Sequence, residues 1–253
     1  MTDLGDALLR SLAWEHERVQ LVQDADCGLQ AAIAIHSTVL GPALGGLRIR
    51  RYEGGLPEAL DDALRLSRAM TLKASAAGLD LGGGKAVMVD DGTGTEDTAR
   101  RGARLRALAR EVERLDGAYV TAEDLGTTTA DMDLIAEHTN HVVGTTRRGG
   151  LGGDPSPSTA RTVLGAMAAA LDVLDGDDAL TGRVVGVIGL GKVGARLAER
   201  LLEAGARVVG TDPVAEPCRS AAALGVEIVA GADELLARRL DVLAPCAVGG
   251  MVD

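Results

Sequence analysis

Two lysines, Lys73 and Lys85, lie on either side of a glycine cluster in the stretch AMTLKASAAGLDLGGGKAVMVDD, residues 69–91. Lysine is rare in this sequence: Lys192 is the third, and every other cation among the 26 Lys and Arg residues is arginine. Arginine stays protonated in proteins, whereas a crowded or buried lysine can lose its proton. A lysine in such an arginine-rich chain is therefore a candidate for acid–base chemistry.

The two lysines and Asp124 suit a deamination. Two ammonium groups in one partly desolvated pocket lower each other's pKa, so one can act as a base while the other holds a carboxylate. Asp124, in TAEDLGTT, follows a predicted strand, precedes a predicted helix and supplies an acid. The glycines of LGGGKA would let a substrate approach the backbone. The structural alternative is a pair of surface lysines and a carboxylate that caps a helix.

A second glycine-rich turn lies in VIGLGKVGARLAERLLEAGARVVGTD, residues 187–212. Its glycines follow an apolar strand and open a helix in the GxGxxG order of dinucleotide-binding folds: one permits a tight turn, one admits a pyrophosphate and one packs helix on strand. Asp212, after the next predicted strand, can bind ribose hydroxyls and repel a 2′-phosphate, so NAD is expected and not NADP. The expected cofactor-binding residues are Gly189, Leu190, Gly191, Lys192, Val193, Gly194 and Asp212.

Composition and charge exclude several classes of function. With 253 residues, 46% of them hydrophobic, the chain can bury a full core. A net charge of -11 disfavours nucleic acid and anionic membranes as partners. The short basic runs RIRR at 48–51 and Arg147–Arg148 are interpreted as solvated. Three cysteines without a CxxC pair fit a cytoplasmic protein with reduced thiols and no structural zinc, and no apolar run is long enough for a membrane span.

The pattern of apolar runs predicts an α/β fold in two domains. Residues 1–150 are expected to form a mixed α/β substrate-binding domain, and residues 151–253 a partial Rossmann-type, doubly wound parallel sheet. The Gly- and Pro-rich stretch at 147–160 is the expected crossing between them. Predicted helices cover 4–17, 56–77, 94–115, 128–138 (capped by Thr127 or Thr128), a long segment ending near 175 and 192–205; predicted strands cover 18–24, 28–38, 85–90, 118–124, 183–189, 206–212, 225–229 and 240–246.

Six motifs cover nearly the whole chain: GPALGGLRIR (41–50), KASAAGLDLGGGKAV (73–87), TAEDLGTTTADMDLIAEHTNHVVG (121–144), GGDPSPSTA (152–160), GLGKVG (189–194) and DVLAPCAVGG (241–250). Together they resemble the amino-acid dehydrogenases of the Glu/Leu/Phe/Val family, with the leucine enzymes the most similar. The resemblance implies reversible conversion of an L-amino acid, NAD and water to a 2-oxo acid, ammonia and NADH, in a cleft between two domains. It also implies a homo-oligomer built through the first domain.

The resemblance implies a role for each catalytic and carboxylate-binding residue in the first half. The backbone of Gly45 and Gly46, together with Lys73, would hold the substrate carboxylate. Lys85 would activate the water that attacks the imino carbon. Asp124 would relay protons to and from the amino group.

The resemblance also implies the substrate class. Leu44, in PALGG, would line an apolar side-chain pocket, which favours branched-chain amino acids such as leucine, valine and isoleucine over glutamate, and Thr159 would sit near the nicotinamide. One apolar pocket separates such side chains by only about 1 to 3 kcal/mol, so a valine or phenylalanine enzyme is an alternative. Because family chains continue beyond the position of Asp253, through a segment with paired asparagines, a non-catalytic remnant or binding subunit is a further alternative.

Overall fold

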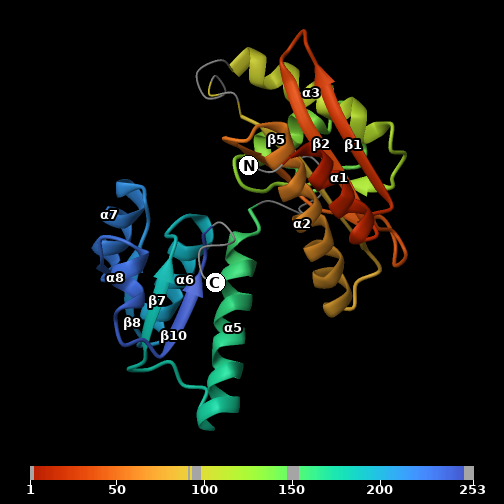
Figure 1. Cartoon of the computed structure of the whole chain (residues 1–253). Coiled ribbons are helices and arrows are strands. Elements are labelled where there is room, and N and C mark those ends of the chain that lie inside the picture. The colour runs from red at the N-terminus through yellow and green to blue at the C-terminus, as the bar shows by residue number, and fades with distance from the viewer. Residues whose placement is uncertain (1–2, 91, 93–97, 147–153, 248–253) are drawn as a thin grey trace. The chain divides into compact units, whose positions relative to one another are not determined.

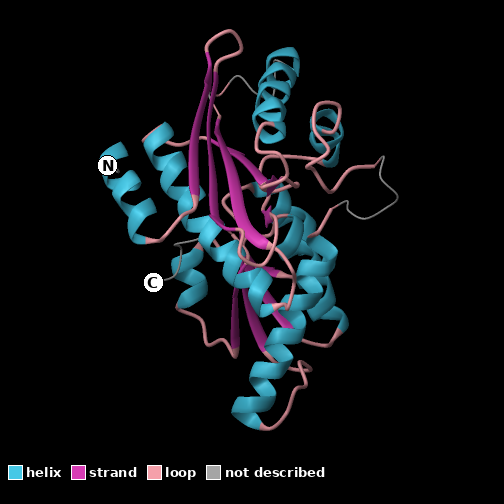
Figure 2. Ribbon diagram, turned by 90° about the vertical axis from the view of Figure 1, so that its right-hand side faces the viewer, coloured by secondary structure: helices cyan, strands magenta, loops and turns pink. Residues whose placement is uncertain are grey.

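The computed structural model describes residues 3–90, 92, 98–146 and 154–247 (Figure 1). It divides into two units, Met1–Asp154 and Pro155–Asp253. The first contains a mixed sheet and the second a parallel sheet, each flanked by helices (Figure 2), so the predicted α/β class is confirmed. The predicted basic pair Arg147–Arg148 and the first half of the predicted crossing at 147–160 lie outside the described residues.

The sheet of the first unit is built around β5 (Gly82–Val89), which begins three glycines before Lys85. The hairpin β1–β2 adds antiparallel strands on one side of β5, whereas β3 and β4 pair with it in parallel. The strand order is β1-β2-β5-β3-β6, with β4 also on β5. The remaining strands are β1 (Arg18–Asp24), β2 (Leu29–Ser37), β3 (Ala43–Leu44), β4 (Leu47–Arg50) and β6 (Tyr119–Val120).

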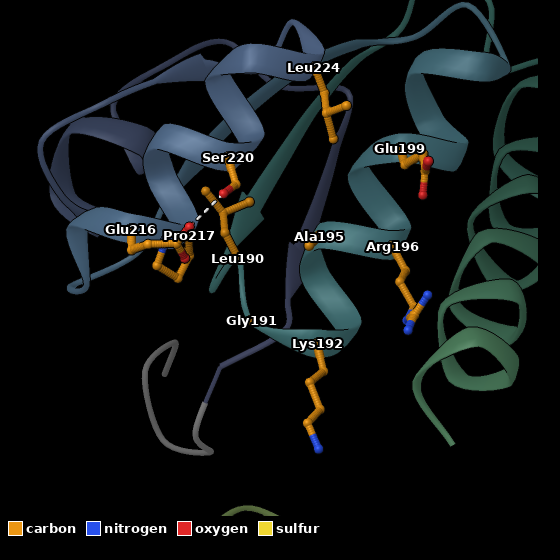
Figure 3. Close-up of a pocket in the computed structure, with 10 residues that line it drawn as sticks. All are labelled: Leu190, Gly191, Lys192, Ala195, Arg196, Glu199, Glu216, Pro217, Ser220 and Leu224. Carbon is orange, nitrogen blue, oxygen red and sulfur yellow. Dashed lines mark hydrogen bonds between the residues drawn. The ribbon is translucent and has the colours of Figure 1, made fainter. Parts of the chain in front are cut away.

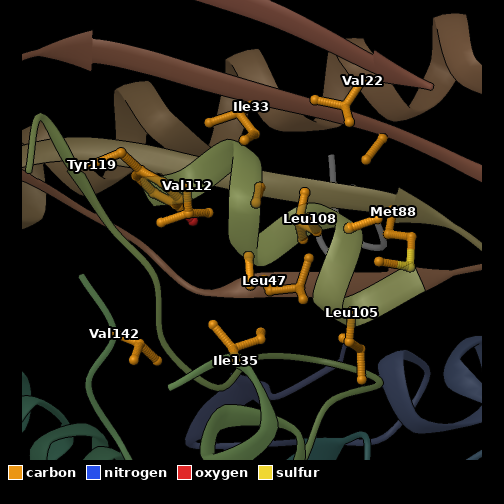
Figure 4. Close-up of a cluster of buried hydrophobic side chains, with 14 of the residues drawn as sticks. Val22, Ile33, Leu47, Met88, Leu105, Leu108, Val112, Tyr119, Ile135 and Val142 are labelled. Atoms are coloured by element: carbon orange, nitrogen blue, oxygen red, sulfur yellow. The ribbon is translucent and has the colours of Figure 1, made fainter. Parts of the chain in front are cut away.

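Helices cover both faces of this sheet, because side chains alternate between the faces along each strand. Ala86 and Met88 of β5 face a core completed by α3 (Thr98–Glu113) and α4 (Thr129–Ile135), which Figure 4 shows. Val87 faces the opposite core, against α2 (Leu56–Ala76). Lys85 has the same parity as Val87 and therefore points toward the α2 side.

Several predicted elements are shorter in the structure. The strand predicted over 118–124 is only β6 (Tyr119–Val120), and the helix predicted over 128–138 is α4 (Thr129–Ile135). The first helix, predicted over 4–17, is α1 (Leu4–Ala13), because Trp14 caps it and Glu15 adopts a left-handed conformation with φ 58° before β1. The last helix of the unit begins after Thr128, whose side chain accepts the N–H of Asp131 in a capping box. Thr128 is thus the cap of the two threonines considered.

The second unit has a four-stranded parallel sheet in the order β10-β7-β8-β9, the 4-1-2-3 arrangement of a Rossmann-type half. Successive side chains of β7 and β8 point to opposite faces of the sheet and enter two cores. One core packs against α5 and α6, and the other packs against α8. None of the described helices is long and apolar enough to cross a membrane. The elements are α5 (Ser156–Asp175), β7 (Val184–Ile188), α6 (Lys192–Glu203), β8 (Arg207–Thr211), α7 (Ala215–Leu224), β9 (Glu227–Ile228), α8 (Ala232–Leu236) and β10 (Val242–Pro245).

Candidate active site and dinucleotide site

Lys85 and Asp124 form an ion pair on the α2 side of the first sheet. Lys85 is 4% exposed, and its Nζ lies 2.8 Å from Oδ2 of Asp124. The loop that carries Asp124 is fixed by Thr127, whose Oγ1 accepts the N–H of Asp124 at 2.8 Å and lies 3.1 Å from the carbonyl oxygen of Leu47 on β4. Since β4 pairs with β5, this loop brings the carboxylate to the lysine.

A second carboxylate is linked to this pair through an arginine that the sequence interpretation missed. Arg48 of β4 lies 3.0 Å from Asp124 through Nε and 3.0 Å from Asp62 of α2 through Nη1. Asp62 also accepts hydrogen bonds from the Tyr52 hydroxyl at 2.7 Å and from Arg65 at 2.6 Å. The interpretation of residues 48–51 as solvated was therefore wrong for Arg48, whose side chain is only 12% exposed.

The surroundings of the pair lower the pKa of Lys85 and keep Asp124 ionised. Burial lowers the pKa of Lys85, and Arg48 lowers it further, against the opposing charge of Asp124. Burial raises the pKa of Asp124, but Lys85 and Arg48 outweigh this effect and hold that pKa below its usual value. The sequence interpretation assigned the lowering at Lys85 to Lys73, which lies exposed at the end of α2; the structure assigns it to burial and Arg48.

The glycines before Lys85 make room for the protein itself. A Cβ on Gly82 would overlap the carbonyl oxygen of Ser37, and one on Gly83 would overlap the backbone nitrogen of Thr71 in α2. A Cβ on Gly84 would lie 2.6 Å from the ring of Tyr119. The expectation that these glycines admit a substrate was wrong, because strand, helix and tyrosine already occupy the space.

Three of the predicted substrate-binding residues lie next to Lys85. Leu44 pairs with Gly83 at the end of β3 and is half-buried. The following residue, Gly45, donates its N–H to Val120 at 3.2 Å and accepts the Tyr119 hydroxyl at 2.5 Å. A Cβ on Gly46 would lie 2.7 Å from Cβ of Asp124, so glycine is required for the carboxylate to reach its place.

Lys73 lies in the last turn of α2, with its side chain exposed. The same helix contacts β5 where Thr71 packs against Gly83. Thr71 lies two residues before Lys73, and Gly83 lies two residues before Lys85. The structure therefore places Lys73 and Lys85 on adjoining segments, one exposed and one buried.

The glycine-rich turn of the second unit has the backbone geometry predicted for it. Gly189 has φ +91°, a left-handed conformation that favours glycine. A Cβ on Gly194 would overlap the carbonyl oxygen of Gly189, so the third glycine permits the close packing of α6 on the turn. Gly191 caps the N-terminus of α6, and a Cβ there would meet open space. The open approach to the amides of this helix end fits a pyrophosphate.

An open pocket of about 460 Å³ lies beside this turn, between α6 and α7 (Figure 3). Leu190, Gly191 and the exposed Lys192 line it. Asp212 accepts the N–H groups of Leu190 and Val214, each at 2.8 Å, and so holds the turn against the end of β8. The donor amides and the carboxylate fit a dinucleotide.

Two other predicted cofactor residues have modest local roles. Val193, in the first turn of α6, is half-buried. Thr159 lies in the first turn of α5, where its hydroxyl donates to the carbonyl oxygen of Pro155 at 3.0 Å.

Comparison with known proteins agrees with these features. The family described as Glu/Leu/Phe/Val dehydrogenase, dimerisation domain, matches residues 16–141, and the D-isomer specific 2-hydroxyacid dehydrogenase NAD binding domain matches residues 167–247. The second unit is thus of an NAD-binding type, with NAD as its cofactor.

Full-length relatives extend the similarity across both units. Leucine dehydrogenase of Geobacillus stearothermophilus is 44% identical over 95% of this chain, which spans 64% of that protein. Valine dehydrogenase of Streptomyces virginiae is 45% identical over 100% of this chain and 71% of its own length. The crystal structure of L-tryptophan dehydrogenase from Nostoc punctiforme superimposes with a TM-score of 0.67, at 33% identity, over 97% of this chain and 68% of that one. The chain belongs to the Glu/Leu/Phe/Val dehydrogenase family.

Proposed function

We propose that this protein catalyses the NAD-dependent, reversible oxidative deamination of branched-chain L-amino acids. The observation that carries the proposal is the buried Lys85–Asp124 ion pair, at 2.8 Å, in a chain whose second unit has a GxGxxG turn. A lysine with a lowered pKa is a base for water, and the adjoining carboxylate is a proton carrier. Both groups are required to turn an imine into a 2-oxo acid and ammonia.

The first unit would bind the amino acid and hydrolyse the imine formed from it. Lys73 and the backbone of Gly46 would hold the substrate carboxylate, which leaves the α-amino group for Asp124. Gly45 would line the site without bonding the carboxylate, because its N–H and carbonyl already bond Val120 and Tyr119. NAD, when bound, accepts the hydride of the α-carbon. Neutral Lys85 would then take a proton from water as its oxygen bonds to the imino carbon. Asp124, which holds the proton it took from the ammonium group before hydride transfer, would return it to the nitrogen. The C–N bond would then break, and ammonia would leave as the proton of the new hydroxyl passes to the freed carboxylate of Asp124.

The second unit would hold the cofactor. The turn from Gly189 to Gly194 would bind the pyrophosphate, since Gly191 leaves the amide end of α6 open. Asp212 would accept a ribose hydroxyl while keeping its two backbone hydrogen bonds, and its charge disfavours a 2′-phosphate. Thr159, in the first turn of α5, would lie near the nicotinamide.

Leucine, with valine and isoleucine, is the proposed substrate set. Leu44 offers an apolar, half-buried side chain beside β5, and a leucine cannot pair with the second carboxylate of glutamate. A valine preference is the second candidate, because relatives of both specificities are similarly identical to this chain. The choice between them rests on differences of about 1 to 3 kcal/mol in one apolar pocket.

The test is NADH formation at mildly alkaline pH with L-leucine, L-valine, L-isoleucine, L-phenylalanine and L-glutamate in separate reactions. We expect turnover with the three branched-chain amino acids and none with glutamate. A glutamate-only activity would contradict the substrate proposal. Silence on all five from a folded protein that binds NAD would support the non-catalytic alternative.

Domain roles, assembly and location complete the proposal. The first unit, predicted as residues 1–150, would bind substrate and form a homo-oligomer, which the dimerisation domain named in its family match supports. The second, predicted as residues 151–253, would bind NAD. The free cysteines fit a reducing cytoplasm. Sedimentation velocity tests the assembly, and a strictly monomeric species at micromolar concentration would contradict it.

A further inference from the structure

We infer that Arg48 is a positioning residue for the proposed deamination, which ties Asp124 to the buried carboxylate of Asp62 and sets the protonation of Lys85. The inference rests on the proposed function for its catalytic meaning. Its geometry stands alone: one guanidinium lies 3.0 Å from each of two carboxylates that come from different elements. Arg48 does not touch Lys85 through any bond described, so it acts through Asp124 and through its charge.

The position of Arg48 follows from the alternation of β4. Leu47 and Ile49 enter the core under α3, so Arg48 must point to the opposite face, toward α2. Asp62 lies there, among the buried residues of α2, with a side chain only 9% exposed. An arginine suits this place because its planar fork can bond two carboxylates at once, which the point charge of a lysine does less well.

Asp62 is held from three directions, so it can act as a fixed anchor. The Tyr52 hydroxyl and Arg65 bond it in addition to Arg48, and these partners keep its pKa below the usual value although burial raises it. Burial raises the pKa of Tyr52 well above its ordinary value, so its hydroxyl stays a donor. An ionised, anchored Asp62 fixes one end of the guanidinium, and the other end fixes Asp124.

The charges around Lys85 act in opposite directions. Arg48 on β4 lowers the pKa of Lys85, whereas Asp124 and Asp62 raise it. Two further titratable groups on the same sheet are uncharged above neutral pH. His36 on β2, bonded to Thr71, has a pKa lowered by burial, and Tyr119 on β6 has a pKa raised by burial. Removal of Arg48 should therefore make Lys85 harder to deprotonate, and neutralisation of Asp62 should make it easier.

Lysine NMR tests the inference without any turnover. The sequence contains only Lys73, Lys85 and Lys192, so protein labelled with ¹³C at lysine Cε gives three signals that can be followed against pH. We expect the Lys85 signal to titrate at higher pH in Arg48→Met and at lower pH in Asp62→Asn. A purely structural role for Arg48 would not produce shifts of opposite sign. A Lys85 signal that stays in place in Arg48→Met, or shifts the same way in both variants, would overturn the inference.

Arg50→Met is the matched control. Arg50 lies on the same strand and face, but its guanidinium stacks on the Tyr52 ring at 4.7 Å, and none of the ion pairs described joins it to Asp62 or Asp124. We expect it to leave the Lys85 titration unchanged. Unchanged fluorescence of Trp14, which packs against the core on the α2 side, shows in each variant that the first unit remains folded. If either Arg48→Met or Asp62→Asn fails to fold, the direction of the Lys85 shift in the other variant decides the inference.

Kinetics supply the second readout. In Arg48→Met we expect kcat to fall about 100-fold, the cost of misplacing a catalytic group by about 1 Å, and the acidic limb of its pH profile to move to higher pH. Arg48→Lys, which keeps the charge, should keep the limb near its wild-type place and recover part of kcat. A wild-type protein that oxidises no amino acid defeats the proposed function, whereas the NMR titration still decides the inference about Arg48.

Discussion

Two glycine-rich stretches, each with a lysine, do opposite things in this protein. Around Lys85 the glycines are buried in a strand, and added side chains would overlap Ser37, Thr71 and Tyr119. Around Lys192, a side chain on Gly191 would meet open space and the lysine is exposed. The first stretch packs protein tightly around a base, and the second leaves room for a ligand. Composition alone does not distinguish the two stretches. They are distinguished by what a Cβ added at each glycine would contact.

The largest effect should come from the acid beside the buried lysine. We expect Asp124→Asn to lower kcat for L-leucine oxidation by about 10³-fold, because positioned proton transfer contributes about 10² to 10⁴. Glu123→Gln, one residue earlier, is the matched control, since the Glu123 carboxylate accepts the Thr129 hydroxyl at 3.0 Å. Steady-state NADH formation checks both. Equal losses in the two variants would argue against a specific role for Asp124.

Alanine at one glycine of each stretch sharpens the comparison. Gly83→Ala should lower the free energy of unfolding by about 1 to 3 kcal/mol, because the methyl group overlaps the backbone of α2. Gly191→Ala should leave stability within about 0.5 kcal/mol and raise KM for NAD about tenfold, because the methyl group stands in the cofactor's approach. Urea unfolding and steady-state kinetics measure the two effects. The reverse outcome would refute the assignment of the two stretches.

Acid should destabilise the first unit through its buried carboxylates. Asp62 and Asp124 have folded pKa values below the ordinary value of 3.8, so the stability they contribute is present above that pH and is lost as pH falls further. Trp14, the single tryptophan, reports urea unfolding of this unit between about pH 2 and 5, a range that contains the expected loss. Asp62→Asn should be less stable overall but show a flatter loss with acid. If stability falls equally steeply with acid in the wild type and in Asp62→Asn, Asp62 does not cause the acid sensitivity.

The smallest effect should come from the exposed lysine. Lys192→Gln should raise KM for NAD only about two- to fivefold, because an exposed charge beside a phosphate contributes little through water. Its kcat should stay at the wild-type value, and the difference in KM should shrink in high salt. A large loss of kcat would mean that Lys192, and not only Lys85, takes part in the chemistry.

Most regular elements were predictable, because they follow from local pattern. The run GLQAAIAIHST specifies β2 by its apolar character. Lys85 and Asp124 were predicted for one site from their residue types and the family resemblance, but their 2.8 Å contact depends on the pairing of β4 with β5, which local pattern does not give. The end of α1 was not predictable, since Glu15 adopts a left-handed conformation that its residue type does not favour.

The Arg48–Asp62 link was missed because its two residues look like surface charges. RIRR reads as a basic run, and Asp62 lies in a helix among other acidic residues. The available signal was periodicity: Arg48 alternates with the apolar Leu47 and Ile49, and Asp62 falls beside the apolar positions of α2. A charge within an apolar stripe is expected to have a buried partner. The sequence could not say which partner, because the pairing depends on the register of β4 against α2.

The most direct test compares the wild-type protein with Lys85→Met for both NAD binding and NADH formation from L-leucine. Calorimetric titration gives the Kd for NAD, and absorbance gives the turnover. The account predicts that the wild type turns over and that Lys85→Met binds NAD with the wild-type Kd while kcat falls at least about 10³-fold. A Lys85→Met protein that still oxidises L-leucine, or a folded wild type that binds NAD and forms no NADH, would contradict the account.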